Sequence, residues 1–146
     1  MPGRVAGYCA TMSRQNVELV RHMHQAFNRR DTETFLGLLD PHVEWVPMMA
    51  RLEGTVYRGR AEVERWLAGL DHDWVDLRTE PREFRDLGDV VLILGSWHAR
   101  ARTSGVVLDS EPAAWVARIR HGKVVRQETF TDQDQAFEAA RRQGRA

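Results

Sequence analysis

The chain has 146 residues, which corresponds to a single domain at about 150 residues per domain. Its content of 42% hydrophobic and 29% charged residues is typical of a globular protein. Because 21 Lys and Arg residues balance 21 Asp and Glu residues, the usual electrostatic basis for binding nucleic acid or an anionic membrane is absent.

We expect one folded domain over residues 13–142, between a disordered leader over 1–12 and a tail over 143–146. The leader shows no hydrophobic period and contains both Gly and Pro. The first helix is predicted over 14–29, because Ser13 is a suitable N-cap and apolar residues then recur at helical spacing. No internal repeat or low-complexity linker divides the domain.

The next segment predicts two further helices, separated by a short strand and a loop. A short helix follows the cap Asp31 and ends at Asp40, because the residue before a proline is pushed out of the helical region. A strand is predicted over 43–47 and an irregular loop over 48–58. The following helix has one apolar face, formed by Val63, Trp66, Leu67 and Leu70.

From residue 74 onward the hydrophobic pattern has a period of two, which is typical of strands. The predicted elements are strands over 74–87 (interrupted at Pro81), 90–102, 106–120 and 124–131, and a closing helix over 132–142. Helices followed by consecutive strands indicate an α+β domain, in which three helices cover the concave face of a curved antiparallel sheet. A binding pocket is expected inside such a cup.

Four segments resemble the SnoaL-like branch of the nuclear transport factor 2-like superfamily: NVELVRHMHQAFNRRD, LLDPHVEW, VYRGRAEVERWL and HGKVVRQETFTD. Together they cover about Gln15 to Ala140. The resemblance implies a cone-shaped α+β barrel, commonly a homodimer, with a mostly apolar pocket and a few acid–base groups at its base. The superfamily includes ketosteroid isomerases, polyketide cyclases, epoxide hydrolases and binding proteins, so the function has to be argued from the site.

The working residues of two of these enzyme types are replaced in this sequence. When the segments are aligned, the catalytic base of ketosteroid isomerase falls on Trp45, its Tyr on Met23 and its buried acid near Ala114. Steroid isomerisation by that mechanism is therefore not expected. The Asp on the final strand of the polyketide cyclases is also missing, and Glu128 is the neighbouring acid that would replace it.

Asp132 and His98 are the predicted catalytic pair. The last Asp of the epoxide hydrolases corresponds to Asp132, whereas their Arg and other Asp fall near Ser96 and His98. If Glu128, Phe130 and Asp132 share one face of the last strand, Asp132 lies in the pocket, where apolar surroundings make a carboxylate a better base. His98 would then relay the proton or polarise a carbonyl. The alternatives are that Asp132 caps the last helix and that His98 is a structural or exposed histidine.

Aromatic residues are the second candidate feature, because aromatic faces stack on flat ligands and exclude water. We expect Trp45 and Phe130 to form pocket walls and Tyr57 to lie at the mouth as a weak acid. Trp66 and Glu128 complete the predicted substrate-binding set. The alternative for each aromatic residue is core packing.

The sequence predicts no metal site and no cofactor. It lacks an HExxH motif, a Cys–His cluster and a dense carboxylate group, and the single Cys9 excludes an internal disulfide. His22 and His24 are two residues apart on a helix and therefore point about 200° from each other. His24 lies on the apolar stripe, where we expect a hydrogen-bonded core residue.

We therefore predict a protein that binds a small apolar organic ligand and carries out cofactor-free acid–base chemistry on it. Isomerisation, cyclisation or water addition on a polyketide- or terpenoid-like substrate fits such a pocket. The alternative is a non-catalytic ligand-binding or dimerisation module. Because no signal peptide and no membrane-spanning stretch is found, we expect a cytoplasmic location with no nucleic-acid or membrane partner.

Overall fold

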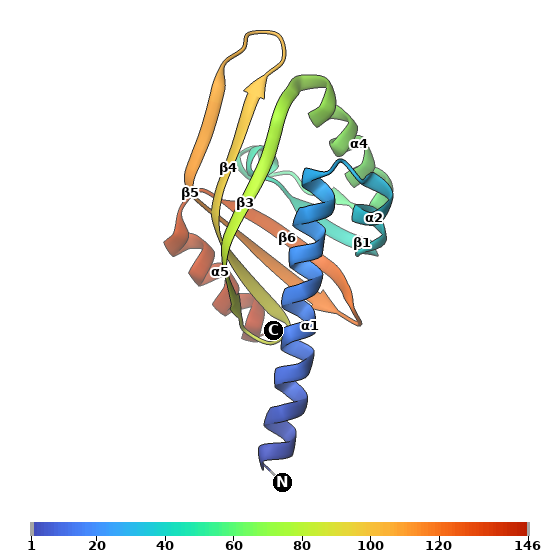
Figure 1. The fold of residues 1–146 in the computed structure, drawn as a ribbon, viewed down its shortest axis with the longest axis vertical. Helices are drawn as coiled ribbons and strands as arrows, with labels where there is room; N and C mark the ends of the chain where they lie inside the picture. Colours follow the sequence, from blue (N-terminus) through green and yellow to red (C-terminus); the bar gives the residue numbers. More distant parts are fainter. Residues whose placement is uncertain (1, 146) are drawn as a thin grey trace.

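The computed structural model describes residues 2–145, with side chains described for 14–144. It confirms the α+β class (Figure 1). The elements in chain order are α1 (Pro2–Asn28), α2 (Thr32–Gly37), β1 (Leu39–Val46), α3 (Met48–Glu53), β2 (Tyr57–Arg58), α4 (Gly59–Asp73), β3 (Trp74–Asp86), β4 (Val90–Ala101), β5 (Val107–Arg120), β6 (Lys123–Phe130) and α5 (Gln133–Arg145). No helix among the described residues is both long and apolar enough to cross a membrane.

The strands form one six-stranded sheet in the order β2-β1-β6-β5-β4-β3. Strands β3, β4, β5 and β6 pair with one another in sequence order and antiparallel, as the hairpin turns predict. The pairing of β1 with β6 is parallel, however, so the sheet is mixed and the prediction of a wholly antiparallel sheet is wrong. Hydrophobic alternation marks a strand but does not give the direction of its partner, and β1 meets β6 across a long stretch of sequence.

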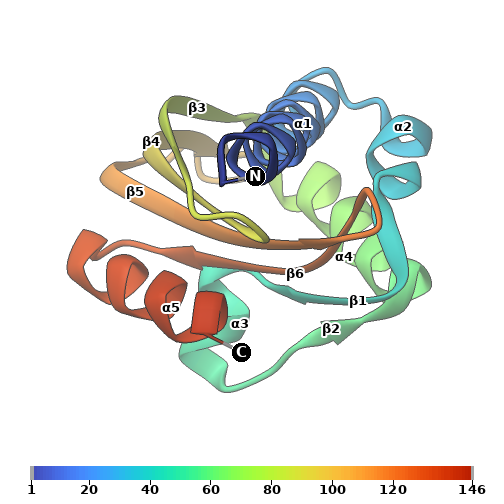
Figure 2. The ribbon, with the colours of Figure 1, turned by 90° about the horizontal axis from the view of Figure 1, so that it is seen from below.

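Different helices cover the two faces of the sheet (Figure 2). Helices α1, α2 and α4 pack on what we call the inner face, over the larger core cluster, which includes Val20, Phe35, Val63 and Ile93. Helix α5 packs on the outer face over a smaller cluster that includes Leu92 and Phe130. The expectation of three helices on one face and a C-terminal helix is therefore confirmed.

Helix α1 begins at Pro2, whereas we expect a disordered leader over residues 1–12. Extending an existing helix adds one hydrogen bond per residue and avoids the cost of nucleation, so the helix can continue back from 14–28 without an apolar period. The side chains of residues 1–13 lie outside those described. Helix α5 also runs beyond the predicted end, to Arg145.

Two local features differ from the sequence-based expectation. The predicted loop over 48–58 contains α3, which is too short to show a helical period. Gly54 caps its C-terminus in the left-handed conformation (φ 72°). Strand β3 continues through Pro81, because it lies at the edge of the sheet, where a missing backbone donor is tolerated. Its register against β4 shifts between Pro81 and Glu83.

Candidate functional site

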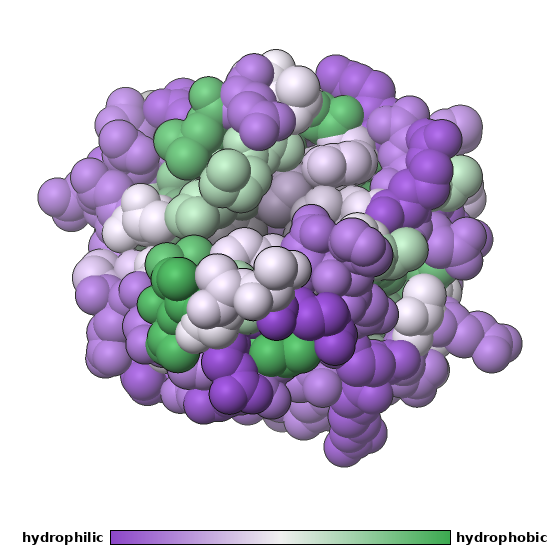
Figure 3. Space-filling model, turned by 90° about the horizontal axis from the view of Figure 1, so that it is seen from above, coloured by the Kyte–Doolittle hydropathy of each residue, from purple (hydrophilic) through white to green (hydrophobic). Residues whose placement is uncertain are grey.

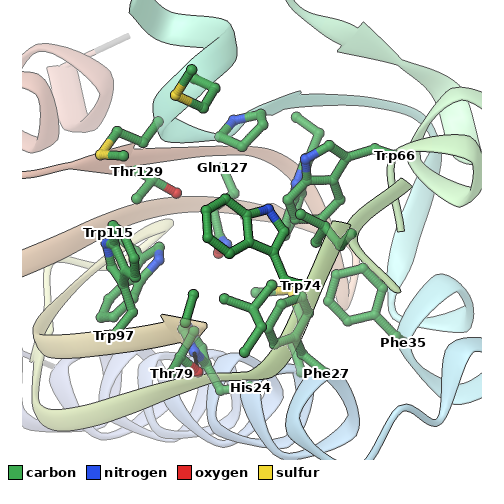
Figure 4. A pocket seen from close by; sticks show the side chains of 18 of the residues that line it. His24, Phe27, Phe35, Trp66, Trp74, Thr79, Trp97, Trp115, Gln127 and Thr129 are labelled. Carbon is green, nitrogen blue, oxygen red and sulfur yellow. Dashed lines mark hydrogen bonds between the residues drawn. The ribbon is translucent and has the colours of Figure 1, made fainter. Parts of the chain in front are cut away.

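An apolar cavity of about 180 Å³ lies between the inner face of the sheet and the helices (Figure 4). All five tryptophans of the chain line it: Trp45, Trp66, Trp74, Trp97 and Trp115. Phe27 and Phe35 add two further rings. The hollow is therefore walled mainly by aromatic planes, the type of surface on which flat molecules stack.

The mouth of the cavity is formed by α3 and by the end of the β4–β5 hairpin. Met49 and Leu108 both line the cavity and are 60% and 41% exposed, so they form part of its rim. Figure 3 looks onto this end of the molecule, where apolar side chains gather around a hollow. A ligand can therefore enter past flexible, unbranched or aliphatic side chains.

The residues that line the cavity include no Asp, Glu, Lys or Arg. The polar side chains among them are His24, Thr79, Gln127 and Thr129, together with the indole N–H groups. No group of three or more His, Cys, Asp or Glu side chains is placed to hold a metal ion within the described part of the chain. The chemistry of the cavity therefore depends on a few neutral polar groups.

His24 is the buried titratable group of the cavity. Its side chain is 4% exposed, and the ring lies edge-on to Trp115 with 4.9 Å between ring centres. Burial lowers the pKa of His24 from 6.5 to about 4, because the protonated ring would lose its hydration. The imidazole is therefore neutral at physiological pH.

Thr79 and Asn28 fix the His24 ring by a chain of contacts that begins at its Nδ1 atom. His24 Nδ1 lies 2.9 Å from Thr79 Oγ1, which in turn lies 3.4 Å from Asn28 Oδ1. The Asn28 amide is fixed because it bonds both backbone groups of Thr79, accepting from its N–H at 2.9 Å and donating to its carbonyl at 2.8 Å. Since Asn28 Oδ1 can only accept, the arrangement favours a Thr79 hydroxyl that donates to Asn28 and accepts from His24 Nδ1–H. In that tautomer, His24 Nε2 carries a free lone pair.

Three buried polar atoms of the cavity lining have no hydrogen-bond partner among the described residues: His24 Nε2, Trp45 Nε1 and Gln127 Oε1. All three side chains are 4% exposed. Buried polar atoms in folded proteins are almost always paired, so unpaired ones need an explanation. All three belong to side chains that line the cavity, so they are the candidate polar contacts for a ligand.

The predicted pair of Asp132 and His98 is not formed. Asp132 is exposed, and its Oδ1 accepts from the backbone N–H groups of Asp134 (2.8 Å) and Gln135 (3.3 Å), so it caps α5. His98 Nδ1 lies 2.6 Å from Asp109 Oδ1, and neither residue lines the cavity. The alternation of β4 directs Trp97 and Ala99 into the cavity and His98 to the opposite face.

The predicted substrate-binding residues divide between the two faces of the sheet. Trp45 and Trp66 line the cavity, as expected. Phe130 does not, because it packs on the outer face with α5. Glu128 also points outward, where it pairs with Arg126 (3.2 Å) and Arg51 (3.4 Å). Tyr57 lies outside the lining, with its ring centre 6.4 Å from that of Trp66.

The polar cavity residues that the sequence-based prediction did not include are Thr79, Gln127 and Thr129. Residues 127 and 129 face the cavity, so the predicted parity of the last strand is shifted by one residue. His24 was correctly placed on the apolar stripe, but a role in the core alone does not account for its free Nε2. The signal available in the sequence was a histidine among the inward positions of the first helix.

Replacing Asp132 by Ala is expected to cost about 1 kcal/mol of stability, because α5 loses its N-cap. Ligand binding in the cavity is expected to stay unchanged. Urea unfolding and ligand titration of the same variant measure the two effects, with Asp134→Ala in the same helix as the control. A large loss of binding without a loss of stability would restore Asp132 to the site.

Comparison with known structures places this geometry in a family. An NTF2-like protein of unknown function from Burkholderia pseudomallei is 25% identical, with 85% of this chain and 95% of that chain covered and a TM-score of 0.72. TerC, co-crystallised with polyporic acid, is 26% identical, with 87% and 98% covered and a TM-score of 0.71. A Xanthomonas campestris protein provisionally described as a polyketide cyclase shares the fold at 20% identity, with 84% and 93% covered and a TM-score of 0.68.

No curated protein matches the sequence. The model of the SnoaL-like domain matches residues 20–127, which include most of the cavity lining, from Met23 on α1 to Gln127 on β6. The chain therefore belongs to the SnoaL-like domain family, with an NTF2-like fold.

Proposed function

We propose that this protein binds a flat, ring-bearing organic molecule in the cavity and transfers a proton on it with His24, without a cofactor. The observation that carries the proposal is a neutral, buried histidine that lines an aromatic cavity and whose Nε2 has no partner among the described residues. The co-crystallisation of TerC, a protein of similar structure, with polyporic acid supports a small organic ligand. This proposal replaces Asp132 by His24 as the acid–base group.

The low pKa of His24 limits the reactions that it can catalyse. A base of pKa about 4 removes a proton efficiently only from an acidic position, such as the carbon between two carbonyl groups. His24 Nε2 would accept that proton, while the Trp45 indole N–H would donate to the oxygen on which negative charge develops. Enolisation of this kind is the first step of an isomerisation or an aldol-type cyclisation of a polyketide-like substrate.

A second candidate function is non-catalytic binding. It is favoured by the lack of any carboxylate in the cavity lining, since a base stronger than His24 is then missing. The two functions share the ligand site and differ in whether protons are exchanged there.

Ligand binding is tested by tryptophan fluorescence, which reports on the cavity because all five tryptophans line it. The neutral phenol 2-naphthol is expected to quench the emission of the wild type. Ala99→Phe, which fills the cavity, is expected to weaken binding at least about tenfold, whereas Ala101→Phe on the same strand but outside the lining is expected to bind normally. Equal affinities in both variants would place the ligand elsewhere.

Proton transfer is tested separately with benzoylacetone, a 1,3-diketone, in deuterated buffer. The wild type is expected to accelerate exchange of the acidic C–H measured by NMR, and His24→Gln is expected to lose that acceleration. Binding with no acceleration in the wild type would favour the non-catalytic function.

A further inference from the structure

We infer that the cavity selects electrically neutral ligands that carry both a hydrogen-bond donor and a hydrogen-bond acceptor, and that it rejects carboxylates. The inference rests on the proposed function, because it assumes that the ligand occupies this cavity. It adds the chemical class of the ligand, which neither the family nor the similar structures assign to this chain.

The rejection of charge follows from the lining. Among the side chains described, those of residues 14–144, no Lys or Arg lines the cavity, and His24, the titratable group there, stays uncharged at physiological pH. An anionic ligand would therefore leave water without gaining a counter-ion. The free energy lost when an unpaired charge leaves water is larger than the free energy gained from the apolar contacts of the same ring system. A carboxylic acid would enter in its protonated form.

The requirement for a donor and an acceptor follows from the three unpaired atoms. Gln127 Oε1 accepts hydrogen bonds, and so does His24 Nε2 in the tautomer that the contact with Thr79 favours. Trp45 Nε1–H donates. A purely hydrocarbon ligand would leave these atoms unpaired, whereas a phenol or hydroxyketone would satisfy both kinds.

The charge preference is tested with three probes of one ring system: naphthalene, 2-naphthol and 2-naphthoate. At pH 7.5 the wild type is expected to bind 2-naphthol at least about 30-fold more tightly than 2-naphthoate. Between pH 7.5 and 5.5 the affinity for the naphthoate is expected to rise about tenfold per pH unit, because the protonated acid is the form that binds. The affinity for 2-naphthol is expected to stay constant over that range.

The polar preference is tested with Gln127→Met, which keeps the length of the side chain and removes its amide. We expect this variant to bind 2-naphthol about tenfold more weakly and naphthalene with unchanged affinity. Trp45→Phe, which removes the indole N–H and keeps a ring, is the second variant and should show the same contrast. Gln25→Met, at an exposed position of α1, is the matched control.

The outcomes separate the inference from the proposed function. Naphthoate that binds as tightly as naphthol at pH 7.5, with no pH dependence, overturns the inference and leaves binding in the cavity intact. Equal losses for naphthol and naphthalene in both variants also overturn it, because they indicate repacking rather than a lost hydrogen bond. If none of the three probes quenches the wild type, binding of ring compounds itself fails, and the inference fails with it.

Discussion

The wild type loses stability between pH 7 and pH 4, and replacing His24 by Gln is expected to make this loss smaller by about 3 kcal/mol. The pKa of His24 is about 4 in the folded protein and 6.5 as the reference for the unfolded chain. As the pH falls below 6.5, the unfolded chain binds a proton that the folded protein does not, so the free energy of unfolding decreases. The decrease levels off near pH 4, where the folded protein is also protonated, and a difference of about 2.5 units corresponds to about 3 kcal/mol.

Urea unfolding at several pH values, followed by tryptophan fluorescence, measures this difference. Protonation of carboxylates lowers stability over part of the same range, but it does so in the wild type and in the variant alike. His22→Gln is the matched control, because His22 lies two residues away on α1 and is exposed. Parallel curves for the wild type and His24→Gln would show that the ring is hydrated in the folded protein, and the neutral base of the proposed mechanism would lose its physical basis.

The position of His24 could be predicted from the sequence, but its role could not. Helical spacing puts residue 24 on the apolar side of the first helix, because that side must face the sheet. Whether a buried histidine is paired on both nitrogens depends on what the fold brings against it. Here Thr79 lies 55 residues further along the chain and reaches only Nδ1. No local pattern contains that information.

The sequence also does not show which residues of each central strand face the cavity. Strand β6 contacts the cavity on one side and α5 on the other, so buried residues occur on both faces: Gln127 inside, Phe130 outside. An alternation of polar and apolar residues identifies the buried face only when the other face meets water. The pattern therefore allows either set of alternate residues on β6 to face the cavity. The prediction places Glu128, Phe130 and Asp132 there, whereas the fold places Gln127 and Thr129 there.

Strand β4 adds a second difficulty, because its first half is buried on both faces. Its residues from Val90 to Gly95 are all buried, so the strand has no polar face from which to count. Val91 and Ile93 belong to the larger core cluster on the inner face, and the same unbroken alternation places Trp97 and Ala99 in the cavity and His98 on the opposite face. A sequence pattern does not show which face of such a strand is the inner one.

Gly95→Ala is expected to destabilise the protein by about 3 kcal/mol, because the added methyl group has no room. A Cβ atom at position 95 would overlap the carbonyl oxygen of Glu80 and lie 2.9 Å from Pro81 Cα. Both are backbone atoms of β3, so relief requires the strand itself to move. Gly69→Ala is the control: on the exposed face of α4 nothing lies within 4 Å, and replacing a helical glycine is expected to stabilise by about 0.5–1 kcal/mol.

Urea unfolding of the two variants should therefore give opposite signs for the same added methyl group. The close approach of β3 and β4 at Gly95 is also near the cavity. Trp97 follows two residues later on β4, and its partner on β3 is Thr79. A separation of the strands there would withdraw the indole from the cavity wall and loosen the Thr79 hydroxyl behind His24. Gly95→Ala that folds should consequently bind 2-naphthol more weakly than Gly69→Ala, and a Gly95→Ala protein with wild-type stability would show that β3 and β4 are not in close contact at this point.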